Sequence, residues 1–168
     1  LAAAQKRTEE RLEELAKAQK KTEEEVAKLA IVIKETRSEL GGLARTIGYA
    51  FENEALRMLP DVLKTKHNIE VVEKLIREEI GGKEINIFGK AKRNGEEVFI
   101  IGEAKLRLDE RRENLEEIFQ DLEGKAQLVT KEYGERKAIK ILVTHFATKG
   151  SLQKANENDI IVVQSFEW

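Results

Sequence analysis

The 168-residue chain has no cysteine, a single proline and a single tryptophan, and only 5% of its residues are aromatic. Without cysteine, neither a disulfide scaffold nor a metal site made of thiolates can form. No apolar stretch reaches the length of a membrane span and no segment resembles a signal peptide, so the sequence predicts a cytoplasmic protein with no membrane partner. The first residue is Leu1 rather than methionine, which leaves open that the chain is a fragment of a longer protein.

The chain also has nearly equal numbers of acidic and basic residues. Charged residues make up 37% of the chain, yet its formal net charge is only −2. Such a chain has no bulk attraction to nucleic acid, so any basic surface must be local. The abundance of Glu and Lys is a compositional tendency of thermophile proteins and indicates no function. The length suits one ordinary domain with an appendage rather than two full domains.

The first part of the chain carries a seven-residue apolar repeat. Steps of four and three residues connect, without a slip, Leu1, Gln5, Thr8, Leu12, Leu15, Gln19, Thr22, Val26, Leu29, Ile33, Thr36, Leu40, Leu43 and Ile47. With Glu and Lys around it, this repeat predicts a coiled coil. A single amphipathic helix folded back on the rest of the chain is the alternative.

The polar members of the repeat weaken its seam and tend to fix the register of a coiled coil. We therefore expect self-association through residues 1–42, as a dimer by default and as a tetramer in the alternative. Gly41-Gly42 is a plausible hinge, because glycine lowers helix stability. Residues 43–168 are expected to form the compact domain.

The pattern of residues 43–168 predicts an α/β (α+β) fold in which helices pack on a mixed sheet. The expected elements are a helix over 43–59 that breaks at Pro60, strands over 69–78, 83–91 and 97–106, a helix from an Asp109 N-cap to Tyr133, a strand over 138–146, a short helix over 151–156 and a strand over 160–166. A helical crossover separates the strands at 97–106 and 138–146, so we expect these two to pair in parallel.

The most informative segment is the hairpin around Asn94-Gly95, the dipeptide that a two-residue type I′ turn prefers. Counting outward from this turn sets Asn86 opposite Glu103 and Glu84 opposite Lys105. Alternate residues of a strand share a face, so these four polar side chains are expected on one side of the hairpin. They are either a functional site or an ordinary solvated edge with a Glu84–Lys105 ion pair.

Three stretches resemble motifs of the PD-(D/E)XK nuclease superfamily, and in particular archaeal Holliday-junction resolvases and restriction-endonuclease-like proteins. Gly48–Glu54 is similar to the first-helix pattern G-x-x-x-E-x-E, Glu84–Ile87 to the strand motif that holds an aspartate, and Ile101–Lys105 to the E-x-K strand. The resemblance covers about residues 44–166. It implies a restriction-endonuclease-like mixed sheet flanked by helices, with the predicted coiled-coil helix in front.

The resemblance also implies a metal-dependent DNA endonuclease that hydrolyses phosphodiester bonds with Mg²⁺ (or Mn²⁺). In this family pattern Glu103, the backbone carbonyl of Ala104 and the residue at position 86 are metal ligands. Lys105 is the residue that stabilises charge or orients the attacking water, and Glu52 is an outer or additional ligand. Metal ions held by oxygen ligands can neutralise the scissile phosphate and generate hydroxide near neutral pH.

Asn86 departs from the pattern, because the family has aspartate at this position. An amide oxygen can still bind Mg²⁺, but it carries no charge, so metal affinity and water activation should both fall. Three explanations are open: a natural inactive member kept for binding, an engineered Asp→Asn change, or a ligand role taken over by Glu84. The alternative function is accordingly a catalytically inactive protein that binds DNA or assembles with a partner.

Overall fold

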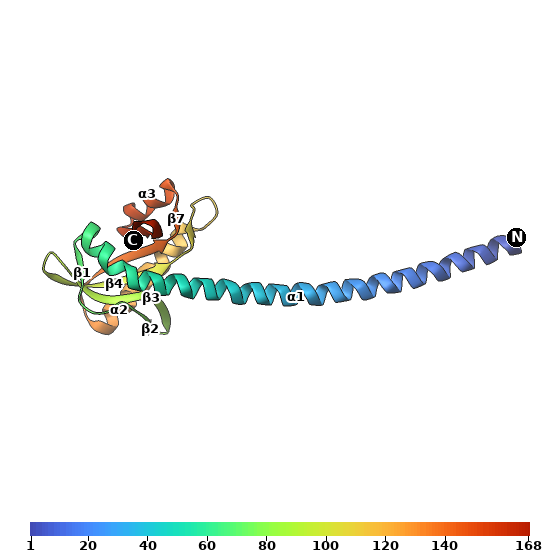
Figure 1. Cartoon of the computed structure of the whole chain (residues 1–168), viewed down its shortest axis with the longest axis horizontal. Helices are drawn as coiled ribbons and strands as arrows, with labels where there is room; N and C mark the ends of the chain where they lie inside the picture. The colour runs from blue at the N-terminus through green and yellow to red at the C-terminus, as the bar shows by residue number, and fades with distance from the viewer. The chain divides into compact units, whose positions relative to one another are not determined.

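The computed structural model describes residues 1–168, and its contacts divide the chain into two units, Leu1–Thr46 and Ile47–Trp168. Its elements, many of which are labelled in Figure 1, are α1 (Ala2–His67), β1 (Ile69–Val71), β2 (Ile76–Ile80), β3 (Lys83–Arg93), β4 (Glu96–Ala104), β5 (Arg107–Leu108), α2 (Leu115–Tyr133), β6 (Lys137–Thr144), β7 (Phe146–Ala147), α3 (Lys149–Glu157), β8 (Ile160–Gln164) and a 3₁₀ turn at Ser165–Glu167. No helix is long and apolar enough to cross a membrane.

Helix α1 continues through two positions where the sequence predicted an interruption. Neither the Gly41-Gly42 hinge nor the break at Pro60 is present, because the helix extends without a gap to His67. Proline inside a helix costs about 3 kcal/mol. Leu59, Val62 and Leu63 are all buried around it, and burying each such side chain stabilises the fold by about 1.5–3 kcal/mol. Packing of these neighbours therefore outweighs the loss at Pro60.

The main sheet confirms the predicted fold class, a mixed sheet flanked by helices and preceded by a long helix. Its strand order is β1-β3-β4-β6-β8, with β2 also paired to β3. Strands β3 and β4 are antiparallel, whereas β4–β6 and β6–β8 are parallel, as expected for strands joined by helical crossovers. Strand β4 thus lies in the middle of the sheet, and its run Val98–Ile101 is buried on both faces.

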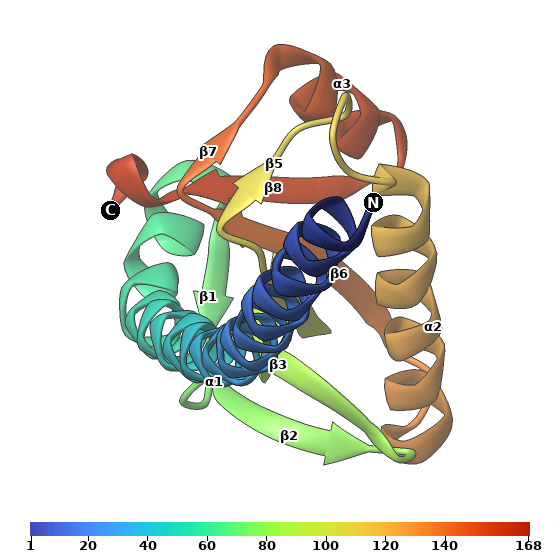
Figure 2. The same ribbon diagram turned by 90° about the vertical axis from the view of Figure 1, so that its right-hand side faces the viewer.

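Two apolar clusters occupy the two faces of this sheet. One contains Phe51, Leu59 and Leu63 of α1 together with Ile87 and Ile100 of the sheet. The other is built around α2, and its members include Leu115, Phe119, Leu122, Val129, Ile85, Phe88, Phe99 and Ile101. Figure 2 shows α2 and the C-terminal part of α1 on either side of the strands.

Several predicted boundaries of the elements were wrong for local reasons. The segment 69–78 forms two short strands, β1 and β2, rather than one. The long helix begins at Leu115, because the side chain of Asn114 accepts a hydrogen bond from Glu117 N and acts as the N-cap. Asp109, the predicted cap, lies in the preceding loop and bonds arginine side chains instead. The Asn94-Gly95 turn has the positive φ angles, 54° and 84°, that a type I′ turn requires.

Strand β3 contains an irregularity that changes which face its residues occupy. Its pairing with β2 shifts between Ile76↔Phe88 and Glu78↔Ile85, so β3 uses three residue steps where β2 uses two. Such an extra residue is a β-bulge, and it reverses the alternation of side chains. Ile85 consequently packs with Phe88 in the α2 cluster, whereas Ile87 packs in the α1 cluster.

Candidate active site at the end of the central hairpin

Asn86 lies where the central hairpin ends. The predicted register is present from Arg93↔Glu96 to Ile87↔Gly102, one step short of the expected Asn86–Glu103 pair. Beyond that point a side-chain bond replaces the backbone pairing: Oδ1 of Asn86 accepts a hydrogen bond from the backbone N–H of Ala104 at 3.3 Å. The residue is only 7% exposed. Asn86 is therefore a buried side chain fixed against the E-x-K segment.

Glu103 is paired with a lysine from α2. Its Oε2 lies 2.5 Å from Nζ of Lys125, which also lies 3.1 Å from Asp121. Burial raises the pKa of the Glu103 carboxyl, although Lys125 and Lys105 oppose this rise. Burial also lowers the pKa of Lys125, but its bonds to Glu103 and Asp121 outweigh this effect and leave that pKa raised. The pair is thus a largely buried charge pair against the sheet.

Lys105 directly follows β4. Its backbone N–H donates to the carbonyl of Val143 at 2.8 Å, which fixes this position beside the parallel strand β6. Its positive charge is one of the influences that lower the pKa of Glu103, but its own ammonium group forms no ion pair. Asn86, Glu103, Ala104 and Lys105 are accordingly gathered at one end of the hairpin, with one lysine free to meet an anion.

The structure places Glu52 and Glu84 in a different group. Glu52 accepts a hydrogen bond from Nε of Arg77 at 3.0 Å, and Arg77 also lies 3.7 Å from Glu84. The Arg77 guanidinium covers the ring of Tyr49, with 4.9 Å to the ring centroid. This group belongs to the α1 face, because the bulge in β3 turns Glu84 away from the α2 face. The expected Glu84–Lys105 pair and the single polar face are therefore wrong.

The oxygen donors at the hairpin end agree in kind with the ligands that Mg²⁺ prefers. They include one carboxylate, Glu103, and one neutral amide, Asn86, while the carboxylate of Glu52 is engaged by Arg77. No group of three or more His, Cys, Asp or Glu side chains is arranged to hold a metal ion. Residues Asn86, Glu103 and Ala104 thus offer a divalent ion one carboxylate and two neutral oxygens, and the ion would have to displace Lys125 from Glu103.

Sequence reasoning did not find that Lys125 pairs with Glu103 or that Arg77 pairs with Glu52. Lys125 had a signal in the sequence, because it lies within the apolar stripe of α2, between Leu122 and Ala126. A lysine among core residues needs a carboxylate partner. The sequence contained no comparable signal for Arg77, because only the fold brings β2 beside the first helical turns of the domain.

A cluster of arginines adjoins the E-x-K segment along the chain. Asp109 is 1% exposed and lies within 4 Å of the guanidinium groups of Arg107, Arg111 and Arg112, which remain about half to three-quarters exposed. The Arg107 guanidinium also lies over the ring of Phe146, 5.1 Å from its centroid. One buried carboxylate therefore holds three outward-facing cations next to Lys105.

We expect acid to loosen this cluster. The bonds from Arg111 and Arg107 lower the pKa of Asp109 to about 2. Because this pKa is lower in the folded state, its stabilisation is present above the usual carboxyl pKa and is lost as the pH falls toward about 2. Asp109→Asn should lower the melting temperature at neutral pH, and its difference from the parent should shrink below about pH 4.

Thermal denaturation followed by circular dichroism over a pH series measures this difference. Asp61→Asn, which removes an exposed carboxylate without an ion-pair partner, controls for the change of net charge. A difference for Asp109→Asn that stays constant down to pH of about 2 would contradict the expected linkage.

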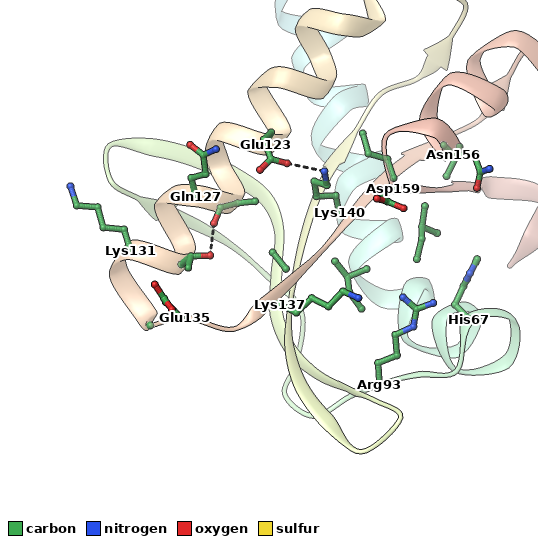
Figure 3. A pocket seen from close by; sticks show the side chains of 18 of the residues that line it. His67, Arg93, Glu123, Gln127, Lys131, Glu135, Lys137, Lys140, Asn156 and Asp159 are labelled. Atoms are coloured by element: carbon green, nitrogen blue, oxygen red, sulfur yellow. Dashed lines mark hydrogen bonds and ion pairs between the residues drawn. The ribbon is translucent and has the colours of Figure 1, made fainter.

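A separate hollow of about 1250 Å³ lies away from these residues, between α2, α3 and the beginnings of β6 and β8. Figure 3 shows Lys140 and Glu123 across its mouth, joined by a bond of 2.8 Å, with His67, Arg93 and Lys137 further along. Its charges are mixed and its size alone assigns it no ligand. None of the predicted site residues lines it.

Comparisons with known proteins give two findings. The family model described as "Domain of unknown function (DUF8196)" matches residues 53–167. A crystal structure of an XisH family protein from Nostoc punctiforme PCC 73102 is similar over 67% of this chain and 93% of that chain, with 15% sequence identity and a TM-score of 0.39. A similarity this weak supports no conclusion about function. The search of curated proteins finds no match.

Proposed function

We propose that this chain, which belongs to the family described as a domain of unknown function (DUF8196), hydrolyses phosphodiester bonds of DNA with Mg²⁺ or Mn²⁺. The observation that supports this most is the position of Asn86, Glu103 and Lys105 together at the end of the central hairpin. The E-x-K resemblance assigns roles to these residues, and the mixed α+β sheet is consistent with a restriction-endonuclease-like arrangement.

In this proposal Glu103, Asn86 and the carbonyl of Ala104 would hold the metal ion. When bound, the ion would neutralise the scissile phosphate and make hydroxide available near neutral pH. Lys105 stabilises the negative charge that develops on the phosphate, as an unpaired cation at the edge of a half-buried site can do. Glu52 is left out of the proposed metal site, because Arg77 holds it in the group on the α1 face of the sheet.

In this proposal the arginine cluster around Asp109 contacts the DNA substrate. Arg107, Arg111 and Arg112 follow Lys105 closely in the sequence, and each forms an ion pair with Asp109. Guanidinium groups bind phosphate oxygens in DNA without reading its bases. Recognition through DNA shape and backbone therefore suits this surface. We further propose that residues 1–42 join the chain to a second copy of itself as a coiled coil.

A second candidate is a non-catalytic DNA-binding or assembly protein. The specific observation in its favour is that Glu103 already forms an ion pair with Lys125, while the side chain of Asn86 is uncharged. In that case the arginine cluster would bind DNA and the hairpin end would perform no chemistry.

The decisive experiment compares cleavage by the parent chain with cleavage by Glu103→Gln and Lys105→Ala. Labelled supercoiled, branched and single-stranded DNA are incubated with Mg²⁺, Mn²⁺ or a chelator. We expect metal-dependent cleavage that falls at least about a hundredfold in both variants, a loss of about 2.7 kcal/mol of transition-state stabilisation.

Glu97→Gln and Lys92→Ala are the matched controls, because both residues are exposed on the same hairpin. These two variants should retain the parent rate. DNA binding without cleavage of any substrate in either metal would reject hydrolysis and support the second candidate. Equal activity in the site variants and the controls would reject the proposed residues.

A further inference from the structure

The apolar face of residues 1–47 is exposed along its whole length. Leu12, Leu29 and Leu40 are each 58–61% exposed, and the remaining apolar members of the repeat are similarly open. A continuous apolar stripe of this length on a helix needs a partner. We propose that the partner is a second copy of the chain, aligned in parallel and in register. This inference rests on the self-association in the proposed function, and not on cleavage.

The seam of the repeat matches itself best in this alignment. Taking Leu12 as position a of the heptad, the a series is Gln5, Leu12, Gln19, Val26, Ile33, Leu40 and Ile47, and the d series is Leu1, Thr8, Leu15, Thr22, Leu29, Thr36 and Leu43. In a parallel pair in register, each a or d residue meets its own counterpart. Amide then meets amide, hydroxyl meets hydroxyl, and every apolar residue meets an apolar one.

Three of the polar side chains in this seam already have hydrogen-bond partners within their own helix. The hydroxyls of Thr8 and Thr22 donate to the carbonyls of Ala4 and Ala18, four residues earlier in the same helix, at 3.0 Å each. The amide of Gln19 donates to Glu23 at 3.0 Å. A hydroxyl satisfied within its own helix loses little when water is excluded. Burying the layers at Thr8 and Thr22 therefore costs little.

The residues that flank the seam agree with the same alignment. In a parallel pair, each g residue faces the e residue five positions later in the partner. The resulting pairs are Ala4 with Glu9, Arg11 with Ala16, Ala18 with Glu23, Glu25 with Ala30, Val32 with Arg37 and Glu39 with Ala44. In each pair a charged residue faces an uncharged one, so no like charges meet.

Antiparallel alignments fit less well. Full overlap sets Gln19 against Leu29 and Thr22 against Val26, and it brings Glu25 against its own copy. The ion pairs of Glu9 with Arg37 and of Arg11 with Glu39 would be gained, but exposed ion pairs contribute only about 0–1 kcal/mol each. Against this gain, Leu29 and Val26 would pack on polar side chains instead of apolar ones.

A shift of one heptad removes most of these mismatches and is the strongest antiparallel competitor. It sets Leu12 against Leu29, but it leaves Leu43 and Ile47 without partners and places Ile33 against Thr8. Only the parallel alignment in register matches every layer. β-Branched residues at a, here Val26 and Ile33, with leucine at d also favour two strands.

Parallel pairing has a consequence for the proposed sites. Both polypeptides leave the paired helices at the same end, so both copies of residues 47–168 follow from that end. Two phosphodiester sites on one dimer would suit a substrate with two strands. An antiparallel pair would send the two copies to opposite ends.

Cysteine cross-linking tests the alignment cleanly, because the chain has no cysteine of its own. Leu29→Cys and, separately, Leu15→Cys are introduced into the full chain and oxidised mildly. In the parallel dimer each cysteine meets its counterpart, and we expect most of the chain to migrate as a disulfide-linked dimer. Ser38→Cys, on the outer face of the helix, is the control and should stay mostly monomeric.

The antiparallel alignment shifted by one heptad is tested by mixing the Leu12→Cys and Leu29→Cys chains, unfolding and refolding them together, and then oxidising them. Preferential cross-links between the two different variants, or no self-linking at positions 15 and 29, would overturn the parallel register. Sedimentation of the parent chain is measured first. A monomer would refute self-association itself whatever the DNA assays show, and a tetramer would refute the two-stranded form.

Discussion

Replacing Lys125 with methionine is expected to lower the free energy of unfolding by about 3 kcal/mol. The substitution keeps the apolar length of the side chain but leaves the largely buried Glu103 carboxylate without the cation 2.5 Å away. Breaking one partner of a buried pair costs more than removing both, because an uncompensated charge remains. Urea denaturation at neutral pH measures the change.

Adding Glu103→Gln to Lys125→Met should recover part of this loss. The neutral amide needs no cation, so the double variant is expected to be more stable than Lys125→Met alone by about 1 kcal/mol or more. Lys90→Met serves as the control, since Lys90 pairs with Glu73 at 3.3 Å on an exposed surface. Such exposed pairs contribute about 0–1 kcal/mol. If the effects of the two substitutions on the free energy of unfolding simply add in this double-mutant cycle, Lys125 and Glu103 are not coupled.

Asn86→Asp is expected to raise Mg²⁺-dependent or Mn²⁺-dependent cleavage of DNA at least about tenfold, or about 1.4 kcal/mol of transition-state stabilisation. The substitution is nearly isosteric, and the new carboxylate can still accept the hydrogen bond from Ala104 N. It adds a second negative charge near Glu103. Two carboxylates attract a divalent ion more strongly than one ammonium group, so metal binding is favoured over the ion pair with Lys125.

Initial cleavage rates and calorimetric titration with Mn²⁺ measure the two parts of this effect separately. Asn156→Asp, on α3 beside the separate hollow, adds the same charge elsewhere and should change neither quantity. If Asn86→Asp altered neither cleavage nor metal affinity, the assignment of position 86 as a ligand would fail. Tighter metal binding without cleavage would favour the non-catalytic candidate.

Local patterns determined the parts of this protein that depend on neighbouring residues. The heptad repeat predicted a helix, and Asn94-Gly95 predicted both the turn and the pairing from Arg93–Glu96 to Ile87–Gly102. The apolar run Val98–Ile101 is typical of a strand that is buried on both faces, and β4 is such a strand. The helical crossover likewise predicted parallel pairing of β4 with β6.

Tertiary structure decided the side of the sheet on which each polar residue of the hairpin lies. The bulge in β3 depends on how β2 pairs, and it sends Glu84 to Arg77 and Glu52 while Glu103 meets Lys125. A count outward from one turn cannot detect an extra residue beyond it, since strict alternation is lost there.

The same distinction separates the two ends of the chain. The sequence by itself determined which residues form the apolar stripe of the first helix, because a repeat along one helix needs no information from elsewhere. It also located Asn86, Glu103 and Lys105 at one hairpin end. Only the folded domain decided that Glu103 is paired with Lys125 and that Pro60 lies inside a continuous helix, since both depend on packing between segments far apart in the chain.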